Sequence, residues 1–147
     1  MSIFSVLSYG QFPEGFEGAT FPPTGWIRFD NGIGTAQQWN STSTLSLVHS
    51  GAKAAYLQRE NVTDGTTALD WLVSPQVLVP ANGQLRFYTK QLLSGNFGSI
   101  YTIRVSTVSQ NTPTDFTTVQ TWTETNLNTV YNVYEQKFVD LSAYAGQ

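Results

Sequence analysis

The chain of 147 residues contains no cysteine and a single histidine, His49. Without cysteine, neither a disulfide nor a thiolate metal site can form, although the absence does not identify a redox compartment. A catalytic zinc ion needs three protein ligands from His, Cys or carboxylate side chains, so one histidine cannot build a multi-histidine centre. These absences exclude disulfide scaffolds, zinc fingers and multi-histidine zinc enzymes.

Charged residues are also scarce, at 12% of the chain against roughly a quarter in ordinary globular domains. The formal net charge is -3, and the seven Lys and Arg residues are scattered singly, which argues against a nucleic-acid-binding surface. No apolar run approaches the ~20 residues that span a membrane. Residues 1–10 lack the basic start and long apolar stretch of a secretory signal, so we expect any export signal to lie outside the given sequence.

Apolar and polar residues alternate with a period of two along the chain, and no helical period is present. Thr, Val and aromatic residues favour strands, and Gly, Pro, Asn and Ser form the turns between them. We expect strands over residues 3–8, 26–29, 54–57, 70–74, 85–90, 101–106, 116–123 and 131–141. This pattern predicts one all-β domain over residues 1–147, an antiparallel two-sheet sandwich in which residues 1–15 supply the first strand and lead-in.

Six blocks of sequence, in order along residues 16–147, together resemble a known family. They are residues 16–26 with a downstream Trp39, 49–56 (HSGAKAAY), 70–75 (DWLVSP), 101–107 (YTIRVST), 115–117 (DFT) and 139–147 (VDLSAYAGQ). The blocks are similar to those of cleaved-adhesin, or choice-of-anchor J, domains. That family is related to the gingipain adhesin modules and, more distantly, to MAM domains, and the resemblance implies a jelly-roll sandwich.

The resemblance implies a non-enzymatic adhesion module of a larger secreted or cell-surface bacterial protein, with a glycan or a surface protein as partner. Some members carry an Asp-rich loop where this chain has one carboxylate, Asp30, so we do not expect calcium there. In the family, the turn at residues 145–147 leads into a further strand. We therefore expect a domain shortened by one or two strands, or completed by a partner strand or a second copy.

The resemblance also implies a structural calcium ion between the first and last strands. Its ligands here would be the carboxylates of Glu17 and Asp140 and backbone carbonyls of the turn at Ser50 and Lys53. The alternative is that both carboxylates accept hydrogen bonds from turn amides. Asp70, which precedes a strand, is a lesser candidate ligand and otherwise caps a turn.

Catalysis is not expected from the residues present. His49 has no Gly-x-Ser-x-Gly nucleophile elbow or oxyanion motif beside it, so we expect it to pack or to occupy a turn. Glycoside cleavage needs two carboxylates facing each other across a cleft. The ten acidic residues are spread along the chain, and no motif pairs them.

The four tryptophans divide according to their neighbours. Trp26 and Trp71 lie in apolar strand segments, which predicts core positions. Trp39 and Trp122 have polar neighbours, so we expect their rings to stack on sugars or to anchor a protein, with strand-end packing as the alternative for Trp122. Two further functions stay open: a carbohydrate-binding module appended to a secreted hydrolase, and a structural spacer or export passenger.

Overall fold

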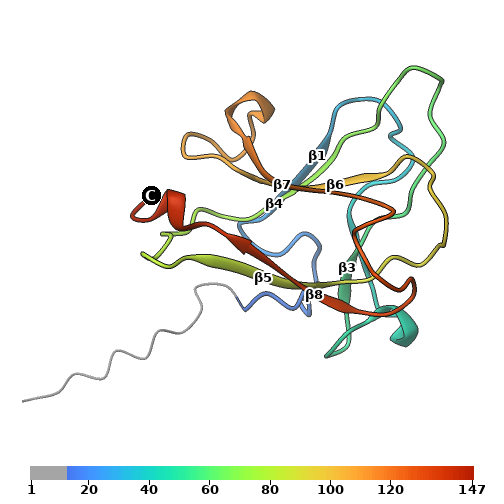
Figure 1. Cartoon of the computed structure of the whole chain (residues 1–147), viewed down its shortest axis with the longest axis horizontal. Coiled ribbons are helices and arrows are strands. Elements are labelled where there is room, and N and C mark those ends of the chain that lie inside the picture. Colours follow the sequence, from blue (N-terminus) through green and yellow to red (C-terminus); the bar gives the residue numbers. More distant parts are fainter. Residues whose placement is uncertain (1–12) are drawn as a thin grey trace, which may run out of the picture.

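The computed structural model describes residues 13–147 and is all-β over that range (Figure 1). Its eight strands are β1 Ile27–Asp30, β2 Asn40–Thr42, β3 Ala54–Tyr56, β4 Asp70–Val73, β5 Gln84–Thr89, β6 Ile100–Val105, β7 Thr117–Thr123 and β8 Glu135–Asp140. Three single turns of 3-10 helix occur at Leu45–Leu47, Pro113–Asp115 and Ser142–Tyr144. The predicted all-β class is confirmed, whereas the strand expected over residues 3–8 lies outside the described residues.

Each described strand pairs with one antiparallel neighbour, which gives the four ladders β1–β4, β2–β3, β5–β8 and β6–β7. In sequence, β2 and β3 lie between β1 and β4, and β6 and β7 lie between β5 and β8. Nested antiparallel pairs of this kind are typical of Greek-key sandwiches and jelly rolls. In Figure 1 the β5–β8 ladder runs below the β1–β4 and β6–β7 ladders, consistent with a β-sandwich.

The aliphatic core of the described residues is small. Leu85 of β5 lies opposite Val139 of β8, which is 3% exposed and is one of only two buried hydrophobic residues in this range. The other is Val79, whose N–H donates to the Gln147 carbonyl at 3.0 Å and whose carbonyl accepts the Gly146 N–H at 2.8 Å. Because so few aliphatic side chains are fully buried, other contacts must join the ladders.

Aromatic rings make those contacts between the ladders. Tyr101 of β6 contacts Trp122 of β7, Phe87 of β5 and Trp39 just before β2, with ring centroids 6.0, 5.9 and 6.4 Å apart. Burial raises the pKa of Tyr101 to about 12, because the charged phenolate loses its water. The β6–β7 ladder is therefore packed against both the β5–β8 ladder and the segment that enters β2.

A second aromatic group joins the β1–β4 ladder to the rest. Trp71 of β4 stacks on Phe29 of β1 with centroids 5.5 Å apart and contacts Phe116, which precedes β7, at 5.3 Å. The Arg104 guanidinium of β6 lies 5.0 Å from the centre of the Trp71 ring. These contacts agree with the core position that the sequence predicts for Trp71.

The strand β8 begins at Glu135, four residues later than the strand expected from Tyr131. The intervening residues form a turn in which Asn132 adopts a left-handed φ of 59°. The Glu135 carboxylate accepts the N–H groups of Thr129 and Val130, which holds the preceding loop against the start of the strand. The prediction was wrong here because alternation does not reveal a left-handed residue, a conformation that Asn tolerates.

Candidate functional site

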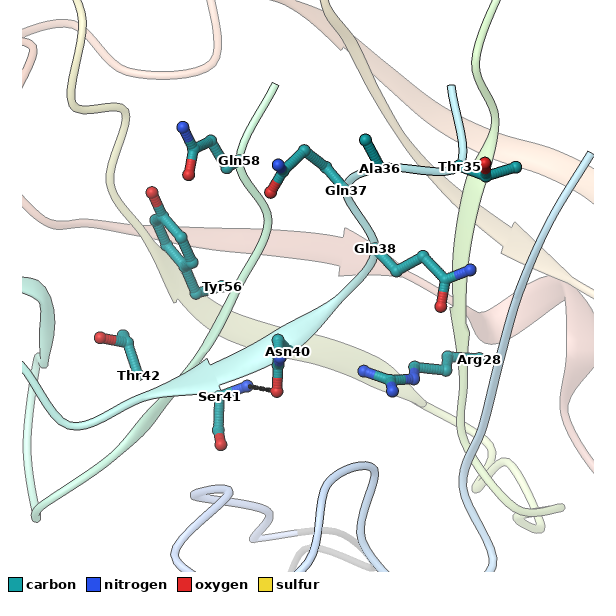
Figure 2. Close-up of a pocket in the computed structure, with 10 residues that line it drawn as sticks. All are labelled: Arg28, Thr35, Ala36, Gln37, Gln38, Asn40, Ser41, Thr42, Tyr56 and Gln58. Atoms are coloured by element: carbon teal, nitrogen blue, oxygen red, sulfur yellow. Dashed lines mark hydrogen bonds between the residues drawn. The ribbon is translucent and has the colours of Figure 1, made fainter. Parts of the chain in front are cut away.

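A polar groove lies where β1, β2 and β3 approach one another, and it has a volume of about 520 Å³ (Figure 2). Its lining has no carboxylate. It consists of amide side chains (Gln37, Gln38, Asn40, Gln58), hydroxyl side chains (Thr35, Ser41, Thr42, Tyr56), Ala36 and Arg28. This surface, called here the amide groove, presents many hydrogen-bonding groups and one positive charge.

The amide groove depends on Trp39, whose ring is held on the opposite side of the chain. That ring contacts Tyr101, and its Nε1 donates to the Asp70 carbonyl oxygen at 3.2 Å. Gln38 and Asn40, on either side of Trp39, line the groove, as do the next residues outward, Gln37 and Ser41.

Two long side chains at one end of the groove are held by hydrogen bonds. Arg28 Nη1 donates to the Trp39 carbonyl oxygen at 2.5 Å, and its guanidinium carbon lies 5.9 Å from the centre of the Phe21 ring. Gln38 Nε2 donates to Asp30 Oδ2 at 2.5 Å. This bond leaves the Gln38 carbonyl oxygen as an acceptor for another partner.

Tyr56, Gln37 and Gln58 lie at the other end of the groove. Figure 2 shows the Tyr56 hydroxyl near the Gln58 amide, with the Gln37 amide further along the same end of the groove. Among residues 13–147, the Tyr56 ring makes no contact with another aromatic ring. Reasoning from the sequence missed Tyr56, because its position at the end of a short strand carries no binding signal.

Three acids, Asp30, Glu60 and Asp70, lie next to residues that line the groove. Asp30 and Asp70 are opposite each other in the β1–β4 ladder, and Glu60 Oε2 accepts the Ala36 N–H at 3.1 Å. Glu60 Oε1 and Asp70 Oδ1 are buried and lack a hydrogen-bond partner in the described part of the chain. The pKa of Asp70 is raised above its ordinary value of 3.8. The largest cause is desolvation by burial, and the negative charges of Glu60 and Asp30 add to it.

Glu17 contacts the turn that the sequence predicts as its partner in a calcium site. Its carboxylate accepts the Ala52 N–H at 3.0 and 3.2 Å and the Lys53 N–H at 3.3 Å. Gly51 has a φ of 76°, and a Cβ at this position would collide with the Glu17 carboxylate. The turn from Ser50 to Lys53 thus directs N–H groups toward Glu17.

Asp140 lies at the end of β8, where its Oδ1 accepts the Ser142 N–H at 2.8 Å. Hydrogen bonds from Ser142 lower the pKa of Asp140. Within residues 13–147, no group of three or more His, Asp or Glu side chains is arranged to hold a metal ion. Both Glu17 and Asp140 therefore bind turn amides, and calcium binding stays a prediction.

The Trp122 ring packs against Phe87 and Tyr101, with both centroid distances at 6.0 Å. Neither Trp122 nor Trp39 is among the residues that line the amide groove. Their side chains instead hold the ladders together, and sugar stacking on either ring stays a prediction.

The single histidine takes part in ring packing. His49 stacks on Tyr88 of β5 with centroids 3.7 Å apart and meets the Tyr134 ring edge-on at 5.1 Å. The Tyr134 hydroxyl in turn donates to the Leu47 carbonyl at 2.6 Å. His49 therefore connects the loop before β3 to the β5–β8 ladder, in agreement with the packing role expected from the sequence.

A second polar groove, of about 410 Å³, shares no lining residue with the amide groove. Its lining includes Asn128, which is 7% exposed and whose Nδ2 donates to the Thr89 carbonyl at 2.9 Å. Tyr131 also lines this groove and is 55% exposed. Tyr131 therefore offers a matched control for substitutions of Tyr56.

Removing the Asp70 charge should stabilise the protein. A raised pKa means that the folded state disfavours the ionised carboxylate, so Asp70 costs stability at neutral pH and this cost disappears as the pH falls through its folded pKa. We expect Asp70→Asn to raise the Tm at pH 7 and to match the wild type below pH 3.8, the ordinary value. Thermal unfolding across pH measures this, with the exposed loop variant Asp64→Asn as control. An unchanged or lower Tm for Asp70→Asn at pH 7 would contradict it.

The calcium prediction has its own test. A ligand that binds only the native state stabilises it by mass action. We therefore expect EDTA to lower the Tm of the calcium-loaded wild type, and the Glu17→Ala variant to lose that response. Differential scanning fluorimetry in excess calcium and in EDTA measures both. A wild-type Tm that does not respond to EDTA would count against the metal and leave Glu17 as an acceptor for turn amides.

Comparison with known proteins identifies the family. A family model described as Cleaved Adhesin Domain matches residues 11–147. No curated protein and no solved structure gives a significant match. Over residues 13–147, the structure contains no helix that is long and apolar enough to span a membrane. The chain therefore belongs to the Cleaved Adhesin Domain family.

Proposed function

We propose that this chain is a non-enzymatic adhesion module that binds a glycan in the amide groove. The family indicates an adhesion module, and with it an extracellular or surface location. The observation that carries the glycan assignment is the lining of the groove, in which amides and hydroxyls predominate and Arg28 is the single charged side chain.

The chemistry of the lining matches that of a sugar. Every sugar hydroxyl is both a donor and an acceptor, and the amides of Asn and Gln likewise carry both kinds of group. Gln37, Tyr56 and Gln58 all line the same end of the groove, so neighbouring hydroxyls of one sugar ring have several possible partners there. The Tyr56 ring also offers an aromatic face of the kind that packs on the apolar side of a sugar.

Stacking on Trp39 or Trp122 would place the ligand elsewhere. Trp39 does not line the groove but holds its surroundings in place. Its carbonyl oxygen accepts a hydrogen bond from Arg28, and its ring packs against Tyr101. A carbohydrate-binding module appended to a secreted hydrolase would use the same groove. Adhesion to a protein, or a spacer role, would not need it, so glycan binding separates these functions.

A glycan array probed with the full chain tests the proposal. We expect saturable binding that Tyr56→Ala weakens about tenfold, because loss of the ring and its hydroxyl removes about 1.4 kcal/mol. Tyr131→Ala removes the same side chain from the second groove and should bind like the wild type.

Two results would contradict the proposal. A flat array would favour a protein ligand or a spacer role. Binding that survives Tyr56→Ala but is lost in Trp122→Ala, with both variants still folded by circular dichroism, would move the ligand to Trp122.

A further inference from the structure

We infer that the ligand of the amide groove is an acidic glycan, and that Arg28 binds the carboxylate of one of its sugars. This inference rests on the proposed function and specifies the class of ligand. The first observation behind it is that Arg28 is the only side chain of the lining that is ionised at neutral pH. Within residues 13–147, the one ion pair joins Lys137 to Glu135, so Arg28 has no acidic partner.

Arg28 is held in place and retains free donors. Its one hydrogen bond among the described residues runs from Nη1 to the Trp39 carbonyl. A guanidinium carries five N–H donors, so the remaining ones are available to a ligand. The Phe21 ring lies beside the guanidinium, and Arg28 is exposed on β1. A planar, positioned fork of this kind suits the two oxygens of a carboxylate.

The acid closest in sequence to Arg28 is kept from pairing with it. Asp30 lies two residues further along β1 and so projects from the same side of the strand. Its Oδ1 accepts the Gly32 N–H at 2.6 Å, and its Oδ2 accepts the Gln38 amide at 2.5 Å. Both Asp30 oxygens therefore have hydrogen-bond donors other than Arg28, and no ion pair joins Asp30 to Arg28.

Isothermal titration calorimetry of the full chain tests this with three probes: an oligomer of galacturonic acid, the same oligomer methyl-esterified, and a sulfated oligosaccharide of equal length. The ester keeps every ring hydroxyl, but it removes the charge of each carboxylate and adds a methyl group there. We expect the acid to bind at least about tenfold more tightly than its ester, in line with hydrogen bonds to charged groups. The sulfated probe tests the class of anion, because a guanidinium fork can bind two oxygens of a planar carboxylate or two oxygens of a tetrahedral group. We expect the sulfated probe to bind more weakly than the acid.

Substitutions at Arg28 should remove this preference. Both Arg28→Gln, which removes the charge, and Arg28→Lys, which keeps the charge without the fork, should bring the acid close to the affinity of its ester. Arg86→Gln is the matched control, because Arg86 is also exposed, also lies near a phenylalanine ring and is outside the groove. It should keep the full preference.

The outcomes separate this inference from the proposed function. Equal affinity for acid and ester, or an unchanged preference in Arg28→Gln, would overturn the acidic-glycan inference and leave glycan binding intact. Preference for the sulfated probe would overturn the assignment to a carboxylate. Failure of the chain to bind any glycan, on the array and in calorimetry, would overturn both.

Discussion

The half-buried ring of Trp39 makes the contacts on which both the fold and the candidate site depend. It packs against Tyr101, donates to the Asp70 carbonyl, and through its own carbonyl accepts the Arg28 guanidinium. One residue therefore connects β4, β6 and β1 with the segment that enters β2. The residues on both sides of Trp39 in the sequence, Gln38 and Asn40, line the amide groove, so the contacts of Trp39 fix the backbone that carries them.

Aromatic rings hold the ladders together because the strand hydrogen bonds of the described residues join strands only in pairs and do not link one pair to another. Each strand pairs with a single neighbour, and few aliphatic side chains are fully buried. The stability of the arrangement must then come from contacts between ladders, and Tyr101 and Trp71 stand at the two places where three elements meet. Near the groove, the Trp39 ring packs against Tyr101, and this contact fixes the segment that enters β2.

Much of the fold could be predicted from the sequence, because period-two alternation and turn residues are local signals. The positions of β5 and β6 follow from alternation, and that of β4 from a short apolar run, each to within a residue. The site could not be predicted in the same way. Its residues come from β1, β2 and β3 and the loops around them, and only the pairing of the chain brings Arg28, Gln38 and Tyr56 to one surface.

The tryptophans show why the sequence gives an incomplete answer. Polar neighbours indicated a half-exposed residue at Trp39, and the residue is half-buried: Gln38 and Asn40 line the groove while the ring between them packs against Tyr101. Similarly, Asp30 looked like an isolated carboxylate in its loop. Pairing of β1 with β4 places it opposite Asp70, and the charge of Glu60 also acts on that residue.

The central claim is that the glycan-binding surface is the amide groove held in place by Trp39. An NMR titration of the nitrogen-15-labelled full chain with neutral and uronic oligosaccharides tests it most directly. We predict that the largest amide shift changes fall on residues 35–42 and on Arg28, Tyr56 and Gln58. Changes concentrated instead around Gln91 and Tyr131, in the second groove, or no changes at all, would contradict the account.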